Sequence, residues 1–151
     1  MLHIALCEPE IPPNTGNIAR LCVATGASLH LIGRLGFHLD DRSLRRAGID
    51  YWHELSVQRH TSLEEFEAVY PSSRLFCFSA KAKRPYTQAA YQRGDVLLFG
   101  GESQGLPDSV LARHADRALC IPMPAGKVRS LNLATAVGIV LYEALRQLEA
   151  W

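Results

Sequence analysis

The chain has 151 residues, a length typical of one domain that buries an apolar core. Hydrophobic residues make up 48% of it and charged residues 21%, a balance that excludes an intrinsically disordered chain. The net charge of +1 excludes a molecule that attracts nucleic acid through its overall charge, so RNA binding would need local basic clusters or an oligomer. We therefore expect a single domain over residues 1–151.

Membrane and secretory signals are missing from the sequence. No apolar run is long enough to cross a bilayer, and residues 1–8 lack the basic region and cleavage site of a signal peptide. Cys7, Cys22, Cys77 and Cys120 lie in apolar segments without the spacing of metal ligands. We expect reduced thiols in a cytoplasmic protein, with no metal site and no membrane partner.

Short apolar runs bounded by glycine, proline or polar residues predict strands, and apolar residues at helical spacing predict helices. The predicted strands span residues 2–7, 28–32, 54–57, 75–79, 95–99 and 118–121. The predicted helices span residues 14–25, 40–47, 62–70, 107–113 and 131–148. Their alternation indicates an α/β fold, with a mostly parallel sheet and helices on both faces. Ligands bind such sheets at the carboxyl ends of the strands.

A proline- and glycine-containing loop, residues 121–130, separates the last predicted strand from the last helix. Such a loop exposes backbone N–H and C=O groups that neither element satisfies. Ser130 is a favourable N-cap for the helix, and Ser130 and Asn132 are placed to reach a small polar ligand. The alternative is an ordinary connection with a capping serine.

Two further loops follow predicted strands. In the segment 14–20, Gly16 permits a tight turn, the free N–H groups of a helix N-terminus attract an anion, and Arg20 lies one turn into the predicted helix. The alternative is a capped helix with a surface arginine.

In the segment 97–107, a glycine pair after a buried strand allows close approach to the backbone, and Glu102 is a candidate polar group. It matches neither G-x-G-x-x-G nor a P-loop, and a plain turn is the alternative.

Together the three motifs resemble the SPOUT class of methyltransferases over nearly the whole chain. They read Asn-Thr-Gly-Asn-Ile-Ala-Arg at 14–20, Phe-Gly-Gly-Glu-Ser-Gln-Gly-Leu at 99–106 and Ile-Pro-Met, then Ser-Leu-Asn-Leu-Ala-Thr-Ala, at 121–136. Residues 8–18 and 44–51 are similar to the tRNA (cytidine/uridine-34) 2′-O-methyltransferases of that class. Gly101 stands where those enzymes commonly have proline, and Ser103-Gln104 where they commonly have Thr-Arg. The second difference bears on how the substrate is recognised, and not on the cofactor.

The resemblance implies a C-terminal trefoil knot, although knots are otherwise essentially absent from proteins. It implies S-adenosyl-L-methionine as the cofactor, tRNA as the substrate, methylation of the wobble ribose, and a homodimer. The implied catalytic residues are Arg20, Ser130, Asn132 and Glu102. The implied cofactor-binding residues are Phe78, Gly100, Gly101, Ile121, Met123, Ser130 and Leu131. The implied substrate-binding residues are Asn14, Arg20, Arg45, Arg46, Lys127 and Arg129. Arg20 acts either as the base or as an anchor for a phosphate, because a free arginine stays protonated.

Clusters of basic residues are candidates for contact with RNA phosphates. They are Arg42, Arg45 and Arg46; Lys81, Lys83 and Arg84; and Lys127 and Arg129. Tyr86 or His38 is a candidate for stacking on a base. Each cluster is equally consistent with a solvated surface. Three alternatives to wobble methylation stay open: methylation at another RNA site, a nucleotide-binding oxidoreductase of the Rossmann type, and a non-catalytic RNA-binding module.

The final predicted helix, 131–148, carries apolar residues around most of its surface. A helix that is apolar on nearly all sides is buried on several sides. With Trp151 at its end and the helix 17–25 beside it, it is a candidate surface for the homodimer, and burial within a single chain is the alternative.

Overall fold

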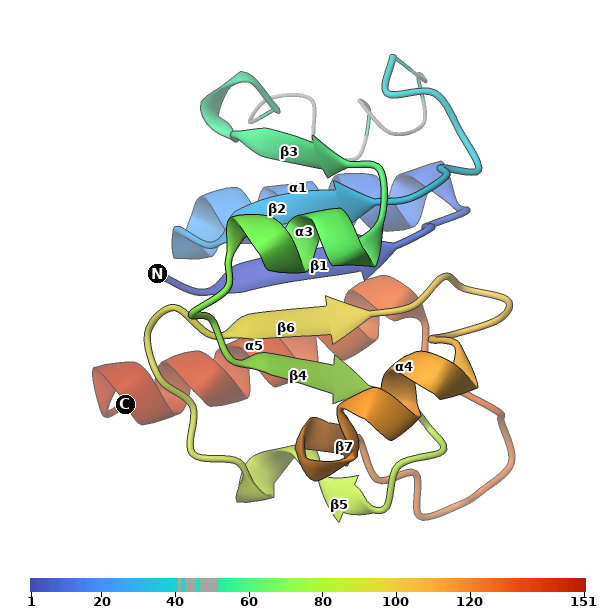
Figure 1. Ribbon diagram of the computed structural model, residues 1–151, viewed down its shortest axis with the longest axis vertical. Helices are drawn as coiled ribbons and strands as arrows, with labels where there is room; N and C mark the ends of the chain where they lie inside the picture. Colours follow the sequence, from blue (N-terminus) through green and yellow to red (C-terminus); the bar gives the residue numbers. More distant parts are fainter. Residues whose placement is uncertain (41, 43–45, 47–51) are drawn as a thin grey trace.

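The computed structural model describes residues 1–40, 42, 46 and 52–151 (Figure 1). Within them lies a seven-stranded sheet in the order β3-β2-β1-β6-β4-β7-β5, and every recorded pair of neighbouring strands is parallel. The strands are β1 (His3–Cys7), β2 (Ser28–Ile32), β3 (Val57–His60), β4 (Leu75–Phe78), β5 (Arg84–Pro85), β6 (Val96–Phe99) and β7 (Ala118–Cys120). All strands run the same way, so their carboxyl ends share one edge of the sheet.

Helices cover both faces of the sheet. Helices α1 (Pro12–Thr25) and α5 (Leu133–Glu149) pack together on one face, and α3 (Leu63–Val69) and α4 (Asp108–Arg113) lie on the other (Figure 1). Three short 3₁₀ turns complete the described elements: η1 (Trp52–Glu54), η2 (Tyr86–Gln88) and η3 (Ala115–Arg117). In the described part of the chain, no helix has the length and apolar character needed to span a membrane.

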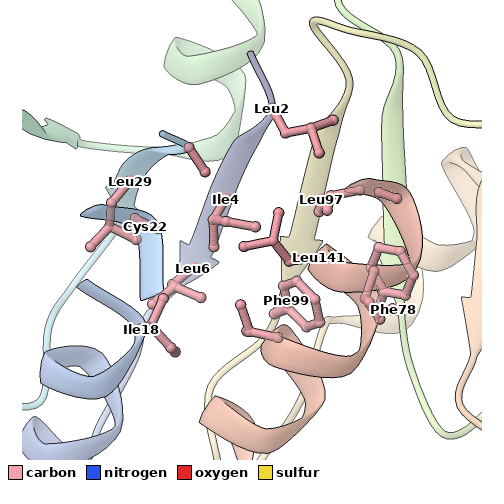
Figure 2. Close-up of a cluster of buried hydrophobic side chains, with 14 of the residues drawn as sticks. Leu2, Ile4, Leu6, Ile18, Cys22, Leu29, Phe78, Leu97, Phe99 and Leu141 are labelled. Carbon is pink, nitrogen blue, oxygen red and sulfur yellow. The ribbon is translucent and has the colours of Figure 1, made fainter. Parts of the chain in front are cut away.

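Alternate residues of each central strand feed two separate apolar cores. Figure 2 shows the core beneath α1 and α5, where Ile4, Leu6 and Leu97 of the sheet meet helix residues such as Ile18 and Leu141. The second core lies beneath α3 and α4, and its buried members include Ala5, Cys77, Leu98 and Phe66. Strands β4 and β6 are buried on both faces, which explains why their sequences are continuously apolar.

The predicted α/β class with a parallel sheet is confirmed, and so are most of the predicted elements. The strand predicted at 54–57 is wrong: η1 occupies part of that stretch and β3 starts at Val57. Strand β3 is at the edge of the sheet and exposes Arg59, so it lacks the apolar run that marks a central strand. The two-residue strand β5 was not among the predicted strands. The helix predicted at 40–47 lies largely outside the described residues.

Two helix starts differ from the prediction. Helix α1 begins at Pro12, two residues early, because a proline at the first helical position needs no hydrogen-bond acceptor. Helix α5 begins at Leu133 with Asn132 as its N-cap, not Ser130. Gly26 ends α1 in a left-handed conformation with φ of 78°.

Candidate functional site

The loops that leave β1, β6 and β7 all begin at the carboxyl edge of the sheet. Strands β1 and β6 are direct neighbours, so residues 8–11 and 100–107 lie next to each other. The third loop, 121–132, returns from β7 to α5, which packs on α1 and β6. The three sequence motifs therefore meet at one place in the fold.

Glu102 connects the second motif to the first. Its Oε1 accepts a hydrogen bond from the Glu10 N–H at 2.8 Å, and its Oε2 accepts one from the Ile11 N–H at 2.8 Å. The Asn14 side-chain amide donates to Oε2 at 3.2 Å. We had expected the N–H groups at this helix start to be free for a ligand anion. Instead, the Glu102 carboxylate accepts hydrogen bonds from the N–H groups of Glu10 and Ile11, which directly precede the helix.

Asn14 and Asn132 connect the first motif to the third. The side-chain Nδ2 of Asn132 donates to Oδ1 of Asn14 at 3.0 Å. The Oδ1 of Asn132 accepts from the Thr135 N–H at 3.1 Å and caps α5. One asparagine thus joins the starts of α1 and α5 although residues 14 and 132 are far apart in sequence.

Glu10 and Ser103 form a second link between the first two loops, and sequence analysis missed both as site residues. The Ser103 hydroxyl donates to the Glu10 carboxylate at 2.7 Å, and the Ser103 N–H donates to it at 3.0 Å. These bonds hold the pKa of Glu10 below its usual value. Glu10, Asn14, Glu102, Ser103 and Asn132 are hereafter called the carboxyl-edge network. The only signal for the missed pair was that Ser103 replaces the threonine common in the resembling enzymes.

The glycines after β6 are required by the protein's own backbone. A Cβ on Gly100 would lie 2.1 Å from the carbonyl carbon of Gly105, and a Cβ on Gly101 would lie 2.6 Å from the Glu8 carbonyl oxygen. The loop closes on itself through the Gly105 N–H, which donates to the Gly101 carbonyl. We had assigned the glycine pair to close approach by a ligand, and the internal contacts are sufficient to explain it.

Arg20 is an exposed residue of α1. Because α1 begins at Pro12, Arg20 lies eight residues into the helix, about 12 Å along its axis at 1.5 Å per residue. It is therefore more than two turns from the helix start, not one turn as predicted.

The loop 121–131 leaves many backbone groups available. Within that stretch, which the structure describes throughout, the one backbone–backbone hydrogen bond that begins and ends there joins the Gly126 N–H to the Met123 carbonyl. Ser130 is exposed, and the side chains of Ile121, Met123 and Leu131 are half-buried. At the end of β4, Phe78 is buried and stacks on Phe99 at 4.9 Å between ring centroids. A loop with half-buried apolar side chains and with few backbone groups bonded to one another offers both apolar and polar contacts to a small ligand.

The basic candidates are used in different ways. Lys81 is paired with Asp108 at 2.9 Å, and Arg84 donates to the Gln88 carbonyl. Lys83, Lys127 and Arg129 are exposed. Arg42 and Arg46 are also exposed, whereas Arg45 and most of the stretch 44–51 lie outside the described residues. His38 is exposed, and Tyr86 is half-buried with its carbonyl accepting from the Tyr91 hydroxyl.

The chain matches known proteins over almost its full length. The sequence model described as "SpoU rRNA Methylase family" matches residues 1–142. The chain belongs to this SpoU methylase family. A relative from Escherichia coli strain K12 with the name "tRNA (cytidine(34)-2'-O)-methyltransferase" is 49% identical over 149 residues, which cover 98% of this chain and 94% of the relative.

Solved structures of related proteins have the same fold as this SpoU-family chain. One, described as "Structural insights into the 2-OH methylation of C/U34 on tRNA", is 51% identical with a TM-score of 0.95 and covers 100% of this chain and 98% of that one. The SpoU methyltransferase AviRb from Streptomyces viridochromogenes, solved "in complex with the cofactor AdoMet", is 26% identical with a TM-score of 0.89. That match covers 100% of this chain and 62% of AviRb. Among the described residues, no cluster of His, Cys, Asp and Glu could hold a metal ion.

Proposed function

We propose that this chain is an S-adenosyl-L-methionine-dependent methyltransferase that acts on the 2′-hydroxyl of the wobble nucleotide 34 of tRNA. The observation that carries the proposal is the 49% identity over 98% of the chain to an enzyme named for that reaction. The convergence of the three motif loops at the carboxyl edge supports it, because that edge is where ligands bind parallel α/β sheets. We propose one domain over residues 1–151, because α1 near one end of the chain packs on α5 near the other.

The loops 100–105 and 121–131 are the proposed cofactor site. Ile121, Met123 and Leu131 would contact the apolar parts of S-adenosylmethionine, and Ser130 and the exposed backbone groups would bind its polar parts. Phe78, Gly100 and Gly101 would shape the site from behind, through the stacked rings and the tight turn. The bound cofactor supplies an electrophilic methyl group on a sulfonium.

Arg20 is the residue we propose to act on the RNA. A ribose hydroxyl is a poor nucleophile until its proton is drawn away, and an exposed guanidinium either orients the ribose through a phosphate or takes part in removing that proton. Asn14, Glu102 and Asn132 act as positioning residues, since their polar atoms are bonded to one another. Exposed Lys127, Arg129 and Arg46 are proposed to contact phosphates, and Arg45 is proposed on sequence resemblance alone.

Isothermal titration with S-adenosylmethionine and with NAD separates this function from the oxidoreductase alternative. Binding of S-adenosylmethionine alone is expected, and binding of NAD alone would overturn the proposal. Mass spectrometry of tRNA treated with the protein should then find one ribose methyl at position 34. A methyl at another position would support the alternative RNA site, and binding without turnover would support a non-catalytic module.

The Arg20→Ala variant tests the proposed role of Arg20. It should lower turnover by about 100-fold or more while S-adenosylmethionine still binds, because the side chain lies on an exposed helix position. The Arg20→Lys variant keeps the charge and loses the planar fork, so it separates an anchor from a geometric requirement. Wild-type turnover by Arg20→Ala would remove Arg20 from the reaction.

The proposed working unit is a homodimer that uses α5. Only one stripe of α5 is fully buried: Leu133, Val137, Val140, Leu141 and Ala144. Tyr142 is 45% exposed and Trp151 is 67% exposed, with their ring centroids 6.0 Å apart. Sedimentation of Tyr142→Arg should reveal monomers, whereas the matched variant Val69→Arg, on exposed apolar surface of α3, should not. A wild-type protein that is monomeric at micromolar concentration and fully active would contradict this proposal.

The proposed trefoil knot concerns the path of residues 121–132. Strand β7 is separated from β6 by β4, yet the helix that follows it contacts β6 and α1. If the C-terminal segment passes through a loop of the chain, a stable domain fused after Trp151 should slow refolding, and the same domain fused before Met1 should not. Equal refolding rates would contradict the knot. We also propose that the protein acts on its tRNA substrate in the cytoplasm.

A further inference from the structure

Three histidines form a hydrogen-bonded row across neighbouring strands on the α3 face of the sheet. His3 of β1, His30 of β2 and His60 of β3 are joined by two contacts between ring nitrogens. His3 Nδ1 lies 3.0 Å from His30 Nε2, and His30 Nδ1 lies 3.1 Å from His60 Nε2. His30 is 0% exposed and His60 is 6% exposed. The four nitrogens form two separate pairs, so they do not converge on a metal ion.

Aromatic rings of α3 cover this histidine row. Phe66 contacts His30 and His60 with ring centroids 5.1 and 5.0 Å away, both edge-on. Tyr70 contacts His3 and His30 at 5.1 and 5.2 Å, and its hydroxyl donates to Gln58 of β3. The row is therefore the surface on which α3 packs over the edge strand β3.

Few charged groups face the histidine row. The described ones are the amino group of Met1, which precedes β1 and acts on His3, and Glu65 of α3, which acts on His60. The other titratable group in contact is the Tyr70 hydroxyl, while Glu64 and Glu67 of α3 act on Cys7. Burial is the main cause that lowers the pKa of all three histidines, to about 3 for His30, and Glu65 opposes it only at His60.

The number of protons that the row can hold is limited by its geometry. Each of the two nitrogen pairs needs one proton between its atoms, and the two outer nitrogens can carry one each. An intact row therefore holds at most four protons, one more than three neutral rings carry. A second added proton leaves two N–H groups facing each other and breaks one of the two hydrogen bonds.

Backbone contacts connect His60 to the candidate active site. The His60 carbonyl accepts from the Gly33 N–H at 2.9 Å. From the same loop, the Arg34 N–H donates to the Glu8 carboxylate and the Gly36 N–H donates to the Pro9 carbonyl. Residues 8 and 9 directly precede Glu10 of the carboxyl-edge network.

We propose that the histidine row is a pH-sensitive contact that holds β3 and α3 on the sheet at neutral pH and releases them in weakly acidic solution. Release withdraws the support that His60 gives, through residues 33–36, to the loop carrying Glu10. The consequence for methyl transfer rests on the proposed function, whereas the release itself does not.

The sign of the effect follows from proton uptake. A histidine whose pKa is lowered in the folded state stays neutral there, while the released form binds a proton below about pH 6.5. Stability is thus present above about 6.5 and is lost as the pH falls. From pH 7.5 to 5.5, each freed histidine with the ordinary pKa raises the opening equilibrium about tenfold. The expected rise is about 1,000-fold for a row that stays neutral in the folded form.

Hydrogen exchange of the full chain, without RNA or cofactor, measures this release. Exchange of residues 57–70, corrected for intrinsic rates, should rise by the factor above between pH 7.5 and 5.5, and that of β6 and α5 should rise much less. In the double variant His3→Asn/His60→Gln, the new side-chain amides can replace the ring nitrogens of residues 3 and 60 that bond to His30. Because amides do not titrate, only His30 can then take up a proton. Its rise should be about tenfold. The matched control His53→Gln, at a side chain 75% exposed, should behave as the wild type.

Nitrogen-15 NMR of the imidazoles in the wild type provides a test that needs no variant. His3, His30 and His60 should stay neutral in the folded form at pH 5.5. Equal exchange of residues 57–70 at both pH values, or ordinary titration of all three buried rings without release, would overturn the proposal. Neither result would bear on whether the protein methylates tRNA.

Discussion

Replacing Glu102 by Gln tests whether the carboxyl-edge network supports the fold as well as the site. The carboxylate accepts three hydrogen bonds, two from backbone N–H groups and one from Asn14. A glutamine offers one acceptor oxygen. If that oxygen takes the place of Oε2, the NH₂ group of the glutamine takes the place of Oε1. It then faces the Glu10 N–H, and the hydrogen bond from Glu10 is lost. The two remaining bonds also lose their ionic character.

Hydrogen bonds to charged groups contribute about 1.5–3 kcal/mol each. Glu102 is half-exposed, so solvent screens part of the loss, and we expect a destabilisation of about 2 kcal/mol. For a urea m-value of about 2 kcal/mol per molar, the unfolding midpoint should fall by about 1 M. The exchange of the Glu10 and Ile11 amides should rise in parallel, because their acceptor is altered.

Glu149→Gln is the matched control for this experiment. Glu149 pairs with Arg93 at 3.0 Å, and the two side chains are 40% and 61% exposed. Surface pairs of this kind contribute below about 1 kcal/mol, so its midpoint should stay close to that of the wild type. If Glu102→Gln unfolds at the same urea concentration as Glu149→Gln, the network does not stabilise the folded chain and our reasoning is refuted.

Three further substitutions or treatments have defined outcomes. Gly100→Ala should destabilise far more than Gly138→Ala in thermal unfolding, because a Cβ at 100 meets backbone at 2.1 Å whereas a Cβ at 138 meets only the Leu21 side chain at 3.9 Å; similar melting temperatures would contradict the packing described. Asn132→Asp should keep the cap of α5, whereas Asn132→Ala loses it, and both variants lose the donor to Asn14; Asn132→Asp should therefore unfold later, by about 1 kcal/mol, and the reverse order would contradict the capping role of Asn132. Burial raises the pKa of Cys77 to about 12, so a thiol reagent at pH 8 should leave it unmodified in the folded protein, and rapid labelling would indicate that β4 opens readily.

The α/β class and most elements could be predicted because β1, β2, β4 and β6 carry apolar runs that are long enough to recognise. Edge strands were the weak point: β3 carries polar residues, and β5 has two residues. The capping role of Asn132 was missed because Ser130 is an equally good cap residue, and only the path of the loop decides between them.

Three of the predicted site residues, Asn14, Glu102 and Asn132, come together in the structure. Their bonds to one another could not be predicted, because each joins residues 88 or more apart in sequence and depends on how the loops meet. Spacing alone also gave no reason to select Glu10, whose partner Ser103 is 93 residues away. The histidine row could not be predicted for the same reason, because its members are 27 and 30 residues apart on three different strands.

The contact between Asn14 and Asn132, residues 118 apart, has a consequence for synthesis of the chain. At about 5–20 residues per second, the start of α1 is synthesised between about 6 and 24 seconds before its partner at the start of α5. During that interval the nascent chain carries Ile18 and Cys22 of α1 without the α5 residues that share their core. The nascent chain is therefore most exposed to aggregation and proteolysis before α5 is made. A ribosome that stalls before codon 132 releases a product that cannot assemble the carboxyl-edge network.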